Sequence, residues 1–272
     1  MSPSISDAKC VLVIGATSGI GRALALAIHA LPHNPTVIVG GRRQERLDEL
    51  IAKDPQRIKA IRIDTTSPRD TLKAFVSDII NAYPLLDAVI FSSGIQHQHH
   101  FNKPTEVNLD SYAVLEVELT TNYTSIITLI TFFLPHFLKL SEQGVPSFIV
   151  PISSAVGIVP VPSVPNYCAT KAALHSFSLS LDSQLKDTNV HVAEIFPPLV
   201  ESEIHDHQGL TPMLSKIWMP LSEFTEKTMP GLLAGDVQIP IGMAAVLWEQ
   251  FEKGKLERIE EFRKHTQAST TK

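Results

Sequence analysis

The chain has 272 residues, of which 44% are hydrophobic, and its formal net charge is −5. Such a chain can bury the core of one domain, and its interleaved acids and bases leave no basic stripe for nucleic acid or anionic lipid. Residues 1–9 contain no apolar segment typical of a secretory signal, and apolar stretches are interrupted well short of the ~18 residues of a membrane span. With only two cysteines, Cys10 and Cys168, we expect a soluble cytoplasmic protein without disulfides.

The first part of the chain predicts alternating strands and helices. Residues 9–15 form an apolar run that ends in glycine, and an alanine- and leucine-rich helical pattern follows over residues 20–31. The alternation continues with strands at 36–39, 58–63 and 86–91 and helices at 44–51 and 68–82. Strands that are apolar on both faces and alternate with helices indicate a parallel sheet covered on both sides.

The second part keeps this alternation and then becomes irregular. We predict helices over 110–140 and 166–186, and strands over 147–152 and 190–196. Glycines and prolines interrupt residues 203–240, which we interpret as a lid over a ligand site. A short strand at 237–241, an amphipathic helix from Met243 to about Lys264 and a polar tail at 265–272 complete a single α/β domain, a doubly wound sheet of about seven strands over residues 1–272.

A glycine-rich turn, Gly15-Ala16-Thr17-Ser18-Gly19-Ile20-Gly21, lies where the first strand must become the first helix. Unpaired amides at a helix N-terminus and the helix dipole favour an anion such as a pyrophosphate, and glycine allows its close approach. A glycine-rich connection without a ligand is the alternative interpretation.

The whole chain resembles the short-chain dehydrogenase/reductase superfamily. The turn matches that family's T-G-x-x-x-G-I-G motif except that Ile14 replaces the threonine. The resemblance implies a Rossmann fold that binds a nicotinamide dinucleotide. The implied contacts from the turn are Gly15, Thr17, Ser18, Gly19, Ile20 and Gly21.

Two further segments match cofactor contacts of the family. Asp64 matches an aspartate whose side chain meets the adenine, and Thr65 supplies a neighbouring backbone contact; a helix N-cap is the alternative role for Asp64. Ser92-Ser93-Gly94 stands where the family has N-A-G, which implies that Ser92 and Gly94 line the cofactor site.

The end of the second predicted strand indicates NADP rather than NAD. A carboxylate there would bind the ribose hydroxyls of NAD and repel a 2′-phosphate, but this segment reads Gly40-Gly41-Arg42-Arg43. Guanidinium groups suit a phosphate in charge and geometry, so we assign Arg42 and Arg43 to the 2′-phosphate. Pairing of both with Glu45 or Asp48 is the alternative, and Ser18 occupies a position that is often basic in NADP users.

A candidate catalytic pair follows from the spacing of Tyr167 and Lys171, which places a phenol and an ammonium on one face of a helix. A lysine cation favours the phenolate and so lowers the tyrosine pKa. The family resemblance adds Ser154, preferred over Ser153, as the group that binds the substrate oxygen, and Asn122 as the residue that holds a water leading to the lysine. A polar surface residue in mid-helix is the alternative for Asn122.

The segment after the predicted sixth strand departs from the family pattern. Pro197, Val200 and Ser202 match residues that hold the nicotinamide carboxamide, but Pro198 replaces a glycine and removes a backbone donor. We expect this change to affect the lid hinge more than cofactor binding.

Other features have a less specific interpretation. His97, His99 and His100, with His205 and His207, could suggest a metal, but substrate contacts or solvent exposure explain them better, and we predict no metal. Trp218 and Met219 line an apolar substrate cleft or pack within the lid. The apolar stripe of the long helix over 110–140 is core or subunit interface, and the resemblance implies a homodimer or homotetramer.

The sequence therefore predicts an NADP(H)-dependent carbonyl reductase or alcohol dehydrogenase that acts on a small or medium organic molecule. Two alternatives are a non-redox isomerase or cyclase on the same scaffold and a non-catalytic nucleotide sensor.

Overall fold

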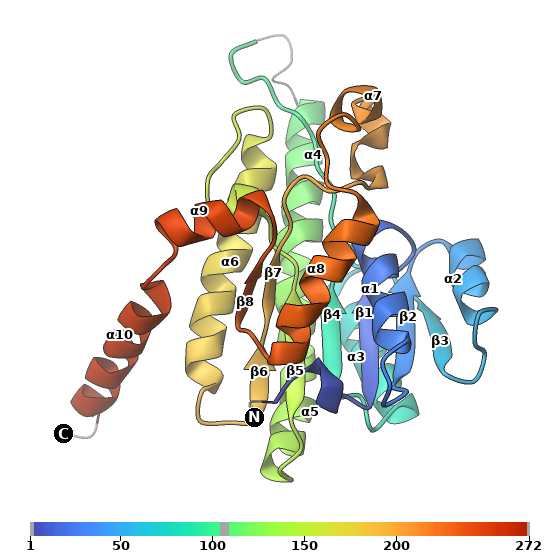
Figure 1. Ribbon diagram of the computed structural model, residues 1–272, viewed down its shortest axis with the longest axis vertical. Helices are drawn as coiled ribbons and strands as arrows, with labels where there is room; N and C mark the ends of the chain where they lie inside the picture. The colour runs from blue at the N-terminus through green and yellow to red at the C-terminus, as the bar shows by residue number, and fades with distance from the viewer. Residues whose placement is uncertain (1–2, 104–108, 271–272) are drawn as a thin grey trace.

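The computed structural model describes residues 3–103 and 109–270 (Figure 1). A single turn at Ile5–Asp7 precedes the first strand. The elements of the first part are β1 (Cys10–Ile14), α1 (Gly19–His29), β2 (Thr36–Gly41), α2 (Gln44–Ile51), β3 (Ile58–Arg62), α3 (Arg69–Ala82) and β4 (Ala88–Phe91). Those of the second part are α4 (Leu109–Leu119), a π-turn (Thr120–Thr124), α5 (Ser125–Glu142), β5 (Ser147–Pro151), α6 (Pro165–Leu185), β6 (Val190–Val192), β7 (Glu194–Phe196), α7 (Thr211–Leu214), α8 (Leu221–Ala234), β8 (Gln238–Pro240), α9 (Met243–Phe251) and α10 (Lys255–Thr270).

Six parallel strands form the main sheet in the order β3-β2-β1-β4-β5-β6. The chain winds outward from β1 to β3 and then crosses to β4 on the other side of β1. In a sheet wound in this way, the loops after β1 and β4 diverge and leave a crevice at the carboxyl ends of the strands, where ligands bind.

The sheet separates two apolar layers, and the alternation of side chains along β1 assigns residues to each. Val11 and Val13 pack with α1, α2 and α8, whereas Leu12 and Ile14 pack with α3, α5 and α6. This confirms a doubly wound sheet covered on both faces. The predicted apolar stripe of α5 is core, since Ile126, Leu129, Ile130 and Phe133 are fully buried.

The strand expected over residues 190–196 is divided at Ala193. The amide of Ala193 donates to Ile149 of β5, whereas the amide of Glu194 donates to Val237, just before β8. Because the chain changes partner at this point, β7 and β8 form a separate parallel pair, linked to the main sheet by a bridge between Ile152 and Ile195. The count of about seven strands in one sheet is therefore corrected to six strands plus a pair.

The segment expected to be irregular over 203–240 is regular in its second half. Helix α8 packs beside α1 and buries Phe224 and Leu232 in the core (Figure 1). The segment that we call the lid is therefore limited to residues 203–219, which contain a 3-10 helix at Glu203–Gln208 followed by the short helix α7. The amphipathic helix expected from Met243 is two helices, broken at Gly254 with a φ of 85°, and the expected polar tail is helical to Thr270.

One helical run, Tyr112–Glu142, is long and apolar enough to cross a membrane by length and composition, among the residues that the structure describes. The sequence expectation that apolar stretches fall short of such a length is corrected here, because the π-turn joins α4 to α5 without a break. The run contributes Phe133 and Phe137 to the core beside the sheet, and 33% of its apolar window is buried.

Candidate functional site

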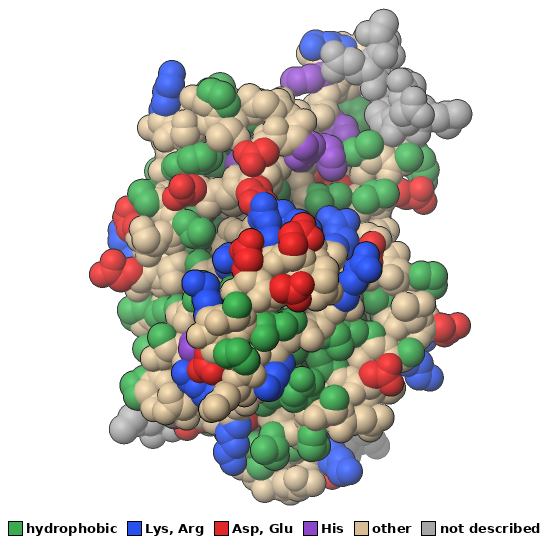
Figure 2. All heavy atoms as spheres, turned by 90° about the vertical axis from the view of Figure 1, so that its right-hand side faces the viewer, with side chains coloured by type: hydrophobic (Ala, Val, Ile, Leu, Met, Phe, Trp, Pro, Cys, Tyr) green, Lys and Arg blue, Asp and Glu red, His purple; other side chains and the backbone are tan. Residues whose placement is uncertain are grey.

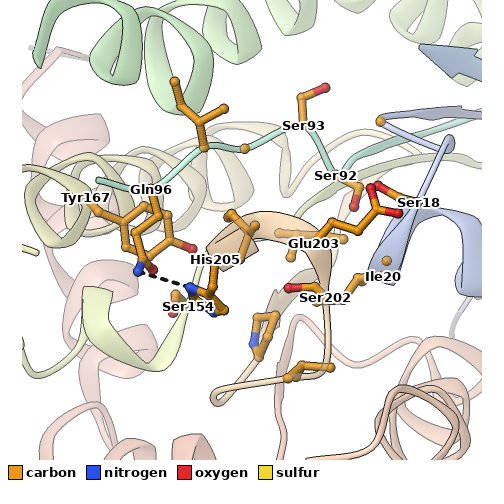
Figure 3. A pocket seen from close by; sticks show the side chains of 18 of the residues that line it. Ser18, Ile20, Ser92, Ser93, Gln96, Ser154, Tyr167, Ser202, Glu203 and His205 are labelled. Carbon is orange, nitrogen blue, oxygen red and sulfur yellow. Dashed lines mark hydrogen bonds between the residues drawn. The ribbon is translucent and has the colours of Figure 1, made fainter. Parts of the chain in front are cut away.

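A cavity of about 720 Å³ opens at the carboxyl ends of β1, β2, β4 and β5. Its lining comes from the loops after those strands, from α6 and from the segment after β7. Figure 3 shows Ser18, Ser92, Ser202 and Glu203 toward one end and Tyr167, Ser154, Gln96 and His205 toward the other. We call the first end the dinucleotide end and the second the reaction end, after the roles that the sequence predicts for their residues.

The glycine turn forms a close-packed floor at the dinucleotide end. A Cβ on Gly15, whose φ is +90°, would lie 2.6 Å from the backbone nitrogen of Ser93, and a Cβ on Gly21 would lie 2.4 Å from the carbonyl oxygen of Gly15. Glycine is therefore required at both positions. The first turn of α1 leaves backbone amides without partners in the helix, and Gly19 and Ile20 line the cavity beside it. These features fit the pyrophosphate of a dinucleotide.

Basic side chains border the same end. Arg43 donates from Nε and Nη2 to Thr17 Oγ1 at 3.1 and 2.9 Å, and from Nη2 to Ser18 Oγ at 2.6 Å. Arg42 lines the cavity from an exposed position and, within the described ranges, forms no hydrogen bond or ion pair. The alternative in which both arginines pair with Glu45 or Asp48 is therefore wrong.

Sequence reasoning missed two charged groups at the dinucleotide end, Glu203 and Arg46. The Glu203 carboxylate accepts from Arg43 at 2.7 Å and from Arg46 at 2.5 Å. Partial burial would raise the pKa of Glu203, but the hydrogen bonds from the two arginines outweigh it and lower that pKa. Arg46 lies one turn beyond Arg42 and Arg43, a spacing that could have indicated it; nothing local marks Glu203.

Three of the four residues predicted to contact the cofactor after β3 and β4 line the cavity: Thr65, Ser92 and Gly94. Asp64 lies beside it, where its Oδ1 accepts hydrogen bonds from the amide and hydroxyl of Thr66 at 3.0 and 2.8 Å. The N-cap of α3 is Pro68, so the alternative role of Asp64 as a helix N-cap is wrong.

The loop after β7 completes the dinucleotide end. The carbonyl of Pro197 accepts from the amide of Ala155 at 2.9 Å, which ties this loop to the segment after β5. Pro197, Pro198, Val200 and Ser202 all line the cavity, and Ser202 lies beside Gly19, since a Cβ on Gly19 would lie 3.4 Å from the Ser202 Cβ.

At the reaction end, the two serines after β5 differ in orientation. The Ser153 hydroxyl donates to the carbonyl of Ile195 at 3.3 Å, toward β7. The Ser154 hydroxyl accepts from the amide of Val156 and also forms a hydrogen bond with Tyr167. Ser154 is thus the serine that shares a site with the tyrosine.

Tyr167 and Lys171 lie on the cavity side of α6, as their spacing predicts. The Lys171 ammonium lies 5.6 Å from the centre of the Tyr167 ring and donates to the carbonyl of Ile152 at 2.8 Å. Burial lowers the pKa of Lys171 to about 8, although the charge of Glu194 opposes this. Burial raises the pKa of Tyr167, and the hydrogen bond with Ser154 opposes that rise.

Asn122 lies in the π-turn between α4 and α5 and is fully buried, so the alternative of a surface residue is wrong. Its Oδ1 accepts from the amide of Ile95 at 2.9 Å, and its Nδ2 donates to the carbonyl of Ile95 at 2.8 Å. Nδ2 also lies 3.2 Å from Thr170 Oγ1 on α6. Asn122 therefore fixes the loop after β4 against α6, the helix that carries Tyr167 and Lys171.

A buried acid near the reaction end, Glu118, was also missed by the sequence reasoning. Its carboxylate accepts from the amide of His97 at 2.9 Å and from Asn166 Nδ2 at 2.6 Å. Burial raises the pKa of Glu118, and its charge raises the pKa of the neighbouring phenol of Tyr167. Glu118 shares the apolar stretch Tyr112–Leu119 with a second acid, Glu116, and nothing in the sequence distinguishes the two.

The reaction end combines a polar and an apolar wall. Gln96 Nε2 and His205 Nδ1 lie 3.4 Å apart and form the polar wall (Figure 3). The apolar wall consists of Val156, Val161, Leu210, Met213, Leu214 and Ile217. Trp218 and Met219 do not belong to this lining; Met219 packs against the core and pairs with Leu199 and Val200.

The histidines of the loop after β4 lie near this wall. His97 packs edge-on against His207, with ring centres 4.7 Å apart, and His99 stacks on Phe101. His100 is exposed. Within residues 3–103 and 109–270, no group of three or more His, Cys, Asp or Glu side chains is arranged to hold a metal ion.

Comparison with known proteins decides the family. The family model described as short chain dehydrogenase matches residues 9–211. The chain belongs to the short-chain dehydrogenase family. A relative from Bacillus subtilis (strain 168), named uncharacterized oxidoreductase DltE, is 36% identical over 206 residues, which cover 74% of this short-chain dehydrogenase and 77% of the relative. The protein is accordingly a member of an oxidoreductase family.

Solved structures agree with the fold of this short-chain dehydrogenase. One from Sphingobium yanoikuyae, in complex with NADPH, has a TM-score of 0.74 at 22% identity and covers 95% of each chain. Another, from Burkholderia phymatum and in complex with NAD, has a TM-score of 0.73 at 17% identity and covers 86% of this chain and 88% of its own. Neighbours in this fold thus bind either nicotinamide dinucleotide.

Proposed function

We propose that this short-chain dehydrogenase is an NADP(H)-dependent carbonyl reductase or alcohol dehydrogenase of the cytoplasm, active on a small or medium organic molecule. The observation that carries the proposal is the convergence of Ser154, Tyr167 and Lys171 at one end of a cavity whose other end presents the glycine turn. A dinucleotide laid along the cavity would extend from that turn to the tyrosine. NADPH, when bound, supplies the hydride.

The catalytic residues have separate roles in this proposal. Ser154 donates a hydrogen bond to the substrate oxygen and orients it, while the phenol of Tyr167 gives its proton to that oxygen, or accepts it in the oxidative direction. Lys171, whose pKa burial lowers to about 8, binds the ribose hydroxyls; the expected lowering of the Tyr167 pKa by Lys171 is not found, because burial raises that pKa. Asn122 holds the loop after β4 and supports a water path to Lys171.

The preference for NADP rests on charge at the dinucleotide end. No acid occupies the end of β2, and Arg42 is exposed beside the cavity, where its charge acts on nearby Asp64 but no hydrogen bond or ion pair to a described residue holds it. A guanidinium in that state binds a phosphate without first losing an ion pair. The walls of the reaction end favour a substrate that carries an apolar body and a neutral hydrogen-bonding group.

The proposal is tested by following the oxidation of NADPH against a panel of ketones, aldehydes and quinones. The Tyr167→Phe variant should lose about 10²- to 10⁴-fold in kcat, the range for a proton-transferring side chain. Tyr112→Phe is the matched control, because Tyr112 is 60% exposed on α4 and should keep full activity. Tight NADPH binding without turnover on any carbonyl would instead favour a non-redox enzyme or a nucleotide sensor.

A further inference from the structure

The carboxylate of Glu203 reaches from the lid segment into the dinucleotide end of the cavity. Figure 3 shows its side chain extended toward Ser18 and away from Tyr167 and Ser154. Its two oxygens accept from Arg43 Nη1 at 2.7 Å and from Arg46 Nη1 at 2.5 Å. On the face that carries α2, basic and acidic side chains accordingly gather side by side (Figure 2). A residue 160 positions away in the sequence thus places an anion on Arg43.

Four of the five N–H donors of Arg43 are used in this arrangement. Its Nε and Nη2 donate to Thr17 Oγ1, Nη2 also donates to Ser18 Oγ, and Nη1 donates to Glu203. Because the hydroxyls of the glycine turn occupy Nε and Nη2, an incoming phosphate meets Arg43 at Nη1, where one of the two N–H groups already donates to Glu203. The two anions therefore compete for the same nitrogen.

The charge on Glu203 also opposes a phosphate directly. A carboxylate held by two arginines stays ionised at neutral pH, and a 2′-phosphate beside it would be a second anion at the same cations. Displacing the carboxylate costs its two ion pairs, which are partly exposed, since side-chain exposure is 38% for Arg43, 32% for Arg46 and 42% for Glu203. The free-energy cost of displacing the carboxylate is therefore modest, as it is for other ion pairs at a protein surface.

We propose that Glu203 is a cofactor-specificity residue, an internal competitor that occupies Arg43 and Arg46 and limits the preference for NADPH over NADH. The inference rests on the proposed use of NADP, since that proposal assigns Arg43, together with Arg42, to the 2′-phosphate. NADH carries no phosphate at that position and leaves the Glu203 contacts in place. Glu203 should therefore weaken the binding of NADPH alone.

The test compares the dissociation constants of NADPH and NADH for the wild-type protein and for Glu203→Gln. Removing the carboxylate should tighten NADPH binding about three- to tenfold, the scale of one or two partly exposed ion pairs, and should change NADH binding by less than about twofold on the same scale. Glu223→Gln is the matched control, since Glu223 is a partly exposed acid paired with Lys227 on α8 and its loss removes the same charge away from the cavity.

A double-mutant cycle with Arg43→Gln isolates the competition. If Glu203 acts through Arg43, the gain of E203Q for NADPH should shrink in the R43Q background, whereas independent effects would add. Unchanged or weaker NADPH binding in E203Q, or equal tightening of NADH, would overturn the competitor role. If the wild-type protein instead binds NADH more tightly than NADPH, the cofactor preference of the proposed function is overturned. This measurement needs no variant, so it is distinguished from a failure of the Glu203 proposal.

Discussion

Ser153 and Ser154 are adjacent in the sequence, yet their backbones place them on different sides of the same segment. The hydroxyl of Ser153 is satisfied by the carbonyl of Ile195, whereas that of Ser154 bonds with Tyr167 inside the cavity. The family resemblance selects Ser154 by its separation from Tyr167, and the geometry favours the same choice.

At the residue scale, Ser154→Ala should lower kcat/KM for carbonyl reduction by about 10²-fold, in line with the loss of one preorganised donor to a reacting oxygen. Ser153→Ala is the matched control and should stay within about threefold of the wild type, because its hydroxyl is used in packing against β7 rather than at the reaction end. Steady-state kinetics on the best substrate of the panel makes the comparison. Equal losses in both variants would refute the assignment.

At the element scale, the π-turn between α4 and α5 holds the loop after β4. A π-turn inside a helix widens the backbone locally, and such turns recur at functional sites. Here it directs Asn122 toward Ile95, so that one side chain satisfies both the donor and the acceptor of a backbone group across the cavity wall. Glu118, one turn earlier, performs a similar task for the amide of His97.

Asn122→Leu should lower the free energy of unfolding by about 2–3 kcal/mol. A leucine has the same branched shape but leaves the amide and carbonyl of Ile95 without their side-chain partners. A buried unsatisfied polar group costs roughly 1–3 kcal/mol, and the half-buried position of Ile95 keeps the sum of the two near the lower end. Chemical denaturation measures the loss, and amide exchange should speed up at Ile95. An unchanged midpoint together with slow exchange at Ile95 would show that the loop after β4 is held by other contacts.

At the scale of the whole molecule, a buried histidine joins the catalytic helix to the C-terminal part of the chain. His175 of α6 lies between two carboxylates, with Nδ1 2.9 Å from Glu194 of β7 and Nε2 2.9 Å from Glu252, which follows α9. Burial lowers the pKa of His175, but the two carboxylates outweigh burial and raise it. Lys255 also contacts Glu252, and Glu194 acts electrostatically on Lys171.

The raised pKa of His175 predicts that stability declines as the pH rises. The folded protein retains a proton that the unfolded chain releases near pH ~6.5, so this stabilisation is fully present below that pH and is lost as the pH passes through the folded-state pKa. His175→Gln should remove this dependence and lower the free energy of unfolding by about 3 kcal/mol at pH ~6, because two buried carboxylates lose their shared partner. Thermal unfolding across the pH range, with the exposed His100→Gln as control, tests both effects. A slope that is unchanged in H175Q would assign the proton to another group.

The sequence by itself determined what depends on neighbours along the chain. Residue periodicity located nearly every strand of the six-stranded sheet and nearly every helix that covers it. The spacing of Tyr167 and Lys171 put both on one helix face. Both signals can be read because they depend on residues only a few positions apart. The glycine turn was equally readable, since Gly15 and Gly21 approach each other within a single strand-to-helix connection.

The tertiary structure alone decided the contacts between distant segments. The partner change at Ala193, the burial of α8 on the core and the pairing of Arg43 with Glu203 all depend on which strands become neighbours. Glu118, Glu194 and Glu252 look like ordinary acids in the sequence, yet each is buried against a partner brought to it by the winding of the sheet. Ion pairs of this kind leave no periodic signal, because their energy comes from packing that forms only when the whole chain is folded.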